Sequence, residues 1–160
     1  MAKSKNQNFS PRIANRKALH DYHVLEKLEV GVVLQGSEVK AIRMGRATLN
    51  EGFARVEPRT EELWLYNVDI GLYPEAGINQ HQGQRPRKLL AKRRQIRELA
   101  GKTSISGATL VPLALYFVRG MVKIELGLCT GKRQQDKRED LKKKQADRDI
   151  RRAMTRRVIR

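Results

Sequence analysis

The clearest pattern in the chain is an alternation of apolar and polar positions over residues 122–128. Its apolar members are Val122, Ile124, Leu126 and Leu128. A period of two is typical of a half-buried β-strand. A second apolar segment, residues 110–118, comes just before it, and Gly120 lies in the short connection, where a positive φ is needed. The pattern predicts a β-hairpin with its turn at residues 119–121.

Three further segments have the composition of strands. Residues 23–34 are rich in branched side chains, and residues 47–56 and 63–68 follow on either side of a charged turn that contains Pro58. Five strand candidates with short turns and no βαβ alternation favour a mainly β protein. We therefore expect an OB-fold-like antiparallel β-barrel with short helices.

Two helices are expected to interrupt the strands. Ser37 has the properties of an N-cap for a short helix that closes at Gly45. The second helix is expected near residues 87–100, and Gly101 would end it. Leu89, Ile96 and Leu99 then lie roughly on one face, with most of the basic residues on the other.

Positive charge is concentrated in three segments. The chain has 34 Lys and Arg against 17 Asp and Glu, a net charge of +17, and residues 1–18, 85–97 and 131–160 hold 25 of the 34 basic residues. The rest of the chain is close to neutral. Clustered cations are the usual signature of a nucleic-acid partner, because each neutralised phosphate releases a counterion. An anionic membrane surface would also attract them, but no basic segment has the bulky apolar stripe of an interfacial helix.

The charge distribution suggests three parts. We expect a basic N-terminal arm (residues 1–18), an OB-like RNA-binding barrel (residues 19–130) and a basic C-terminal tail (residues 131–160). After Gly131 the tail has no further Gly, Pro or aromatic residue, and its apolar stripe is short. Such a segment buries too little surface to fold alone. We expect it to be disordered when free and helical against an anionic partner.

The composition also narrows the class of protein. No apolar run approaches the roughly 20 residues that span a bilayer, and the N-terminal residues lack the apolar core of a secretory signal. Cys129 is the single cysteine, which fits a reducing, cytoplasmic location. Its place in an alternating strand favours an inert thiol.

No pattern points firmly to catalysis. Residues 127–132 resemble a phosphate-binding loop but are one residue short, and Arg133 replaces the hydroxyl residue that would hold magnesium. The three histidines and one cysteine do not form a metal set. Four scattered carboxylates leave a Mg²⁺-dependent nuclease open as an alternative; they are Glu29, Glu38, Glu51 and Asp69. We expect no enzyme activity, metal or cofactor, and carboxylates in such a protein can instead accept hydrogen bonds from RNA.

Five short motifs occur in order along almost the whole chain. They are Asn-Arg-Lys-Ala at 15–18, His-Asp-Tyr at 20–22, Leu-Gln-Gly-Ser-Glu-Val-Lys at 34–40, Arg-Lys-Leu-Leu at 87–90, and Gly-Lys-Arg with Asp-Lys-Arg at 131–133 and 136–138. This series closely resembles the SmpB family of tmRNA-binding proteins. The resemblance implies an OB-like barrel without catalytic activity. It also implies binding to the tRNA-like part of tmRNA, delivery with elongation factor Tu to a stalled ribosome, and a tail in the empty decoding site and mRNA channel.

The resemblance also implies functional residues. Asn15, Glu29 and Leu90 match positions on which RNA binding depends in the family. The matched motifs add Arg16, Lys17, His20, Tyr22, Arg87 and Lys88 as RNA-binding candidates. The tail candidates for the decoding site and its small-subunit RNA are Gly131, Lys132, Arg133, Asp136, Lys137, Arg138 and Met154.

One alternative of the same broad class stays open. A ribosomal protein that threads basic tails through ribosomal RNA would show the same distribution of charge. Composition does not separate the two functions, whereas the resemblance favours the ribosome-rescue adaptor.

Overall fold

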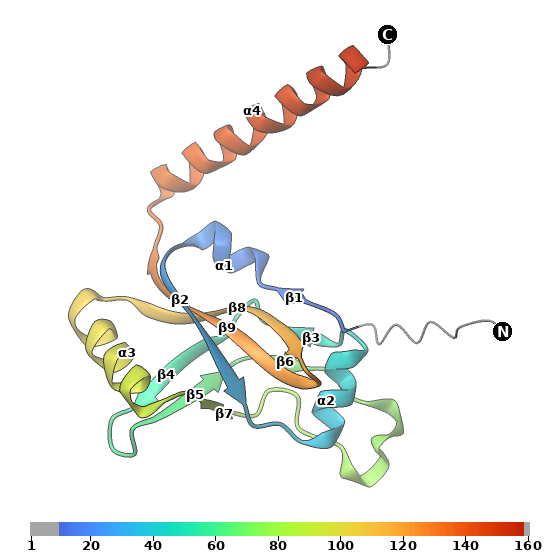
Figure 1. The fold of residues 1–160 in the computed structure, drawn as a ribbon, viewed down its shortest axis with the longest axis vertical. Coiled ribbons are helices and arrows are strands. Elements are labelled where there is room, and N and C mark those ends of the chain that lie inside the picture. Colours follow the sequence, from blue (N-terminus) through green and yellow to red (C-terminus); the bar gives the residue numbers. More distant parts are fainter. Residues whose placement is uncertain (1–9, 159–160) are drawn as a thin grey trace, which may run out of the picture.

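The fold is taken from a computed structural model that describes residues 10–158. The elements in chain order are β1 (Ile13–Ala14), α1 (Arg16–Asp21), β2 (Tyr22–Val32), α2 (Gly36–Arg43), β3 (Ala47–Thr48), β4 (Phe53–Glu57), β5 (Glu62–Tyr66), β6 (Asp69–Ile70), the 3₁₀ segment η1 (Pro74–Asn79), β7 (Arg87–Leu90), α3 (Arg93–Ser106), β8 (Thr109–Val118), β9 (Met121–Gly131) and α4 (Gln134–Val158). The expected mainly β class is confirmed (Figure 1).

The main sheet closes on itself. Its pairings run from β8 through β4, β5, β7, β2 and β9 and return to β8, and every one is antiparallel. Such a circuit is a small barrel and is compatible with the OB-like fold expected from the strand pattern. Strand β1 pairs with β8 farther along the edge that contacts β4, with Ile13 opposite Leu115. Short strands β3 and β6 form a separate pair.

The predicted hairpin is present as β8 and β9. Its connection is Arg119-Gly120, and both residues have positive φ, 50° and 79°, as a two-residue hairpin turn requires. The alternating apolar side chains of β9 all point inward, and Ile124 is 0% exposed. Local sequence periodicity therefore located this hairpin correctly.

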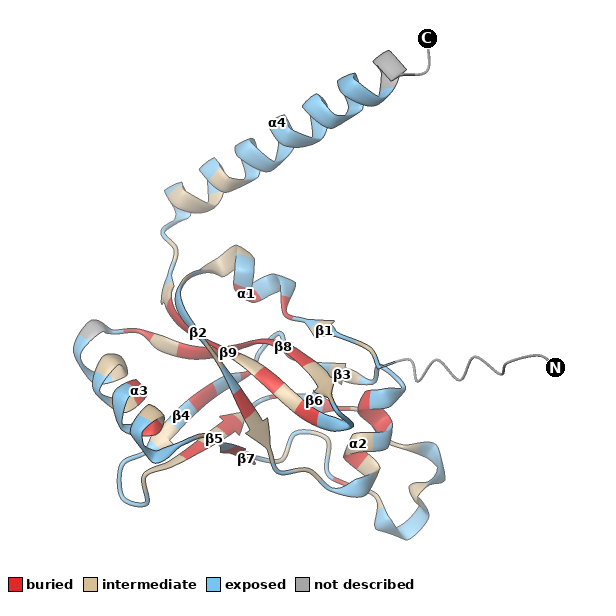
Figure 2. Cartoon of the chain, viewed as in Figure 1, coloured by how far each residue is buried: buried red, intermediate tan, exposed pale blue. Residues whose placement is uncertain are grey.

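The core lies inside the barrel, where the buried residues of all the longer strands meet (Figure 2). The expected strand over residues 47–56 is divided into β3 and β4 by a turn at Leu49–Gly52. This turn brings the backbone close to two side chains. A Cβ atom at Gly52 would lie 2.6 Å from Val68 and 2.8 Å from Pro112.

Both helix expectations need correction. Residues 87–90 form strand β7, so the second helix, α3, begins at Arg93 and continues through Gly101 to Ser106. The reason is the burial alternation in β7, where Arg87 and Leu89 point inward and Leu90 points outward. In α2 the N-cap is Gln35 rather than Ser37.

The two basic ends of the chain also differ from the sequence expectation. Residues 1–9 of the arm lie outside the described residues, whereas residues 13–18 belong to the folded body through β1 and the buried Ala18. The tail, expected to be disordered when free, is instead the continuous helix α4, which projects away from the barrel (Figure 1). Residues 141–155 are all exposed. Helix-forming side chains and local capping, not burial, account for this conformation.

Gly52 and Gly101 provide a matched test of this packing. We predict that Gly52→Ala lowers the free energy of unfolding by about 1–3 kcal/mol, because its methyl group would overlap the side chains of Val68 and Pro112. Gly101 lies within α3, and a Cβ atom added there would have no neighbouring atom within 4 Å. Gly101→Ala should therefore raise that free energy by about 0.5–1 kcal/mol. Urea unfolding measures both free energies, and equal effects of the two variants would contradict the close packing at the 49–52 turn.

Candidate RNA interface and tail junction

Asn15 holds the N-terminal segment against the barrel. Its Nδ2 donates to the carbonyl oxygens of Leu49 and Pro112, each at 2.9 Å, and its Oδ1 accepts from the Ala18 N–H at 3.0 Å. The last bond caps α1. Asn15 is 0% exposed. In this arrangement it cannot contact RNA directly and instead fixes the position of α1.

Helix α1 presents the neighbouring candidates to solvent. Arg16 and Lys17 are exposed, and His20 is half-buried. A cavity of about 340 Å³ lies between α1 and the turn before β4, with Tyr22 and Phe53 among its lining residues. Lys17 forms an ion pair with Glu51 beside it. This end of the barrel therefore combines cations with partly exposed aromatic rings.

The tail leaves the barrel beside the end of α1. Tyr22, the first residue of β2, pairs with Gly131, the last residue of β9, and the Lys132 N–H donates to the Asp21 carbonyl at 2.9 Å. The Asp21 carboxylate also lies 3.1 Å from Lys137 in the first turns of α4. Hydrogen bonds from His20 and Lys137 lower the pKa of Asp21 below its ordinary value.

Further polar contacts link the start of α4 to α1, to β2 and to the residues just before the helix. Lys132 Nζ lies 2.5 Å from Asp140 and 3.1 Å from the Leu19 carbonyl oxygen, and His23 lies 3.4 Å from Asp136. Asp136 also accepts a hydrogen bond from the Arg133 N–H at 3.1 Å. The motif residues at 131–138 thus form the junction itself, and the rest of α4 extends beyond it.

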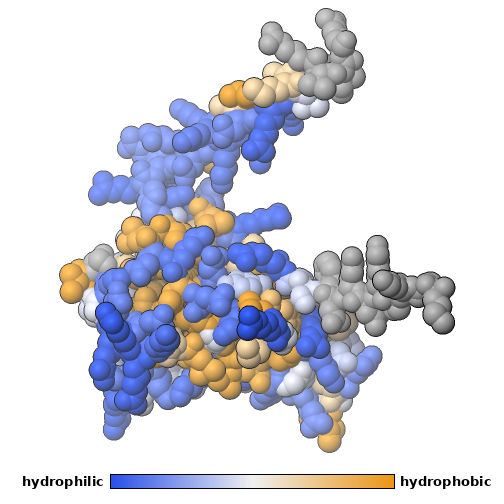
Figure 3. Space-filling view, viewed as in Figure 1, coloured by the Kyte–Doolittle hydropathy of each residue, from blue (hydrophilic) through white to orange (hydrophobic). Residues whose placement is uncertain are grey.

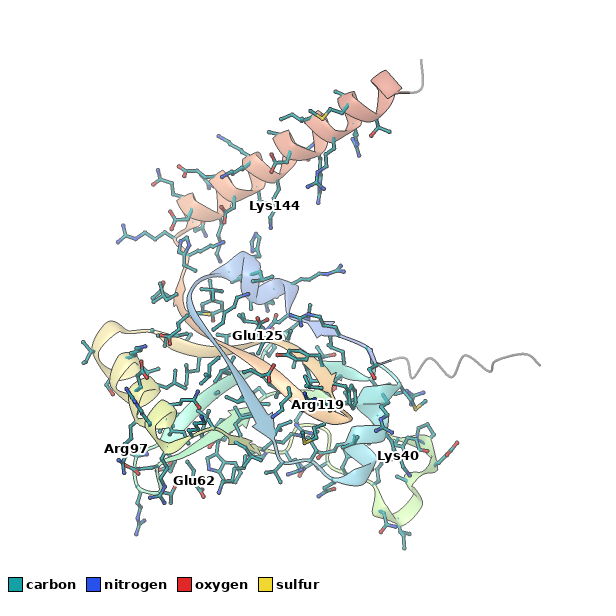
Figure 4. All side chains as sticks on the ribbon, in the orientation of Figure 1. Lys40, Glu62, Arg97, Arg119, Glu125 and Lys144 are labelled. Carbon is teal, nitrogen blue, oxygen red and sulfur yellow. The ribbon has the colours of Figure 1, made fainter. Side chains whose placement is uncertain are left out.

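The projecting part of the tail is strongly hydrophilic. Figure 3 shows blue side chains along most of α4, and apolar ones near its far end, where Ile150 and Met154 are 53% and 64% exposed. Lys144 stands well clear of the barrel in Figure 4. This helix presents cations to a partner without first breaking contacts with the body.

Arg87 lies inside the protein, 1% exposed. Its guanidinium donates to Glu38 Oε1 at 2.9 Å and to the carbonyl oxygens of Val68 and Gly83, each at 2.7 Å. Arg85 binds the same carboxylate, at 2.6 Å from Oε2. Arg87 therefore joins β7 to α2. The sequence suggested that it begins a basic helix, but it lies in a strand with its side chain inside the protein.

The buried Glu38 carboxylate remains ionised because of these partners. Burial alone would raise the pKa of Glu38, but hydrogen bonds from Arg85 and the Gln35 N–H, together with the charge of Arg87, outweigh it and hold the pKa below its ordinary value. The network is also the reason that α2 begins where it does, since the Gln35 N–H belongs to its N-cap.

Glu29, Lys88 and Leu90 share the outside of the barrel. Leu90 pairs directly with Gly31, two residues after Glu29 on β2, and it is 52% exposed. Lys88 forms an ion pair with Glu62. Glu29 is exposed and accepts a hydrogen bond from the Tyr116 hydroxyl at 2.5 Å. The structure therefore brings Glu29 and Leu90 onto one surface, separate from the junction at α1.

Comparison with known proteins decides the family. A model of the family described as SmpB protein matches residues 12–156. The chain is 53% identical to an SsrA-binding protein of Carboxydothermus hydrogenoformans, over 88% of this chain and 93% of the relative. It is 45% identical to one of Corynebacterium diphtheriae, over 98% and 95%. The chain belongs to the SmpB family.

A solved structure supports the same assignment. It is described as "tmRNA-SmpB: a journey to the center of the bacterial ribosome", and it matches with a TM-score of 0.66 and 42% identity. The match covers 82% of this chain and 94% of that one. The SmpB resemblance carried by the five sequence motifs is therefore confirmed.

The side chains considered for metal binding or catalysis have other surroundings in this SmpB fold. Within residues 10–158, no three His, Cys, Asp or Glu side chains come together as metal ligands would. Glu38 binds arginines and Glu51 binds Lys17. Burial raises the pKa of the Cys129 thiol to about 11, so the unreactive thiol form predominates at neutral pH. No helix in the described part of the chain is long and apolar enough to cross a membrane.

Sequence reasoning missed two kinds of residue in this SmpB chain. Asp21 and Asp140 hold the tail junction. Asp21 lies within the His-Asp-Tyr motif and Asp140 within the basic tail, but neither was singled out as a candidate. Tyr116 contacts Glu29 from a position 87 residues away in the chain. Only the register of β8, β9 and β2 reveals that contact.

We predict that Glu38→Gln lowers the free energy of unfolding at pH 7 by about 3 kcal/mol, because two buried or partly buried arginines lose their anion. The lowered pKa means that this contribution is complete above pH 4.5 and is lost as pH falls through the folded-state value. The variant should therefore lose less stability than the parent between pH 5 and pH 3. Urea unfolding across this range is the measurement, with Glu51→Gln, which removes one partner of the exposed ion pair with Lys17, as control. Parallel pH profiles for Glu38→Gln and the parent would contradict the assignment.

Proposed function

We propose that this SmpB family member is the RNA-binding adaptor of trans-translation. It binds the tRNA-like domain of tmRNA, which is SsrA RNA, and brings it to stalled ribosomes without catalysing a reaction itself. The observation that carries the proposal is the match, over nearly the full length of both chains, to SsrA-binding proteins. Ribosomes are its second partner, elongation factor Tu takes part indirectly through tmRNA, and the place of action is the cytoplasm.

The body and the tail have different tasks in this proposal. The barrel with α1 recognises tmRNA, and the junction together with α4 enters the decoding centre and the mRNA channel of the small subunit. At about 1.5 Å per residue, the 25 residues of α4 extend about 37 Å. A cationic helix of that length suits a channel lined by phosphate. Messenger RNA and α4 would compete for the same space, so α4 would enter only an empty channel.

The candidate residues of the body divide into those that can contact RNA and those that position others. Exposed or half-exposed side chains can make direct contacts: Arg16, Lys17, His20, Tyr22, Glu29, Lys88 and Leu90. Asn15 and Arg87 are buried, so we assign them to holding α1 and β7 in place. Loss of either would weaken RNA binding through the structure rather than through a lost contact.

The tail candidates divide in the same way. Gly131, Lys132, Asp136 and Lys137 form the junction that sets where α4 leaves the barrel. Arg133 and Arg138 are exposed there and can contact RNA phosphates. Met154 lies near the far end of α4 and offers an apolar anchor within the channel.

Affinity for the tRNA-like domain of tmRNA tests the proposed function. We predict a preference of at least about 30-fold over an unrelated structured RNA of equal length at near-physiological salt, because shape and hydrogen bonds add to phosphate contacts. Filter binding over a series of salt concentrations measures both affinities. Equal affinities that fall together with salt would instead favour a ribosomal protein that binds phosphate alone.

A further inference from the structure

The outer face of β2, β9 and β8 places two carboxylates directly opposite each other. Glu29 on β2 pairs in register with Glu125 on β9, and their neighbours Val30 and Ile124 are buried, so both carboxylates face outward. Like charges in this position destabilise a sheet. The pair persists because its two members have different surroundings.

Glu125 is paired with two cations, whereas Glu29 is paired with none among the described residues. Glu125 lies 3.1 Å from Arg12 and 3.5 Å from Lys27; Figure 4 labels it on this face. Within residues 10–158, Glu29 forms no ion pair, and its hydrogen-bond partner is the neutral Tyr116 hydroxyl, 2.5 Å from Oε2. Glu29 is exposed, and no hydrogen bond joins its Oε1 to the residues that the structure describes.

The Tyr116 ring is itself held in place. The Arg12 guanidinium lies 4.8 Å from the ring centre while it bonds to Glu125, a cation–π arrangement. The hydrogen bond to Glu29 raises the pKa of Tyr116 to about 12. The hydroxyl therefore keeps its proton at physiological pH and remains a donor to the carboxylate.

We propose that Tyr116 is a positioning residue for RNA recognition, which holds Glu29 through one oxygen so that the other accepts a hydrogen bond from an RNA exocyclic amine or 2′-hydroxyl. This inference rests on the proposed function. The arrangement favours selectivity, because an uncompensated carboxylate repels phosphate and gains energy only where RNA supplies a donor. An RNA whose shape places a phosphate beside Glu29 is therefore repelled by the carboxylate.

The test uses three variants of the full chain: Tyr116→Phe, Glu29→Gln and the two combined. We expect Tyr116→Phe to lower the preference for the tRNA-like domain over an unrelated RNA by about threefold to tenfold, which is the range for the net contribution of one ordinary hydrogen bond. Glu29→Gln should lower it at least as much. The double variant should be no worse than Glu29→Gln alone, because Tyr116 acts through Glu29.

Tyr73 provides a matched control. Its hydroxyl donates to Glu75 at 2.6 Å, and Lys40 lies 5.2 Å from its ring centre, so it reproduces the same chemistry beside η1. Tyr73→Phe should leave the RNA preference unchanged. The slope of log affinity against log salt should also stay constant in Tyr116→Phe, because no cation is removed.

The outcomes separate this inference from the proposed function. Loss of preference in Glu29→Gln with none in Tyr116→Phe would overturn the positioning role and leave the adaptor function intact. Additive losses in the double variant would also overturn it, because Tyr116 would then contact RNA independently. A parent protein without any RNA preference would instead overturn the proposed function. Thermal unfolding that is equal in Tyr116→Phe and the parent assigns any affinity loss to recognition rather than stability.

Discussion

The pairing of β9 along both of its edges is the constraint on which the rest of the structure depends. This strand bonds to β2 on one side and to β8 on the other, and so closes the barrel. The same pairing puts Glu29 opposite Glu125 and brings the start of β2 to the point where the tail departs. The proposed RNA-binding surface around Glu29 and the tail junction therefore lie along the same pair of strands.

A buried ionic network supplies the second constraint. Glu38, Arg85 and Arg87 hold α2 to β7, and Leu90 stands at the exposed end of that strand. The basic residues from Arg87 onward therefore have two different roles. Arg87 stabilises the body from inside, whereas Lys88 and the arginines at the start of α3 remain on the surface.

Local patterns located much of the fold, and long-range contacts account for what they missed. The β8–β9 hairpin was predictable because its alternation runs along one continuous segment with glycine at the turn. Strand β7 was not, because its four residues adjoin α3, and Leu89 also fits the helical face that Ile96 and Leu99 define. The tail pattern identified a helix-forming segment, but sequence alone did not show that the junction would anchor its first turns.

The candidate site was predictable only in part, for the same reason. Motifs marked Asn15 and Arg87, but burial and hydrogen bonds show that both act from inside the fold. Glu29 and Leu90 are exposed, so direct contact with RNA remains a proposal for both. Tyr116 carried no local signal, since its contact with Glu29 spans two strand pairings.

The separation of tasks between body and tail is the central claim, and truncation after Arg133 tests it most directly. This cut keeps all of β9 and the Lys132 bond to Asp21. Loss of the basic tail should weaken binding to every RNA alike. The account predicts that the strand signal in circular dichroism is retained while the helical signal of α4 is lost. It also predicts an undiminished preference for the tRNA-like domain of tmRNA and no tagging of stalled peptides. A truncated protein that still supports tagging, or that folds but loses its RNA preference, would contradict the account.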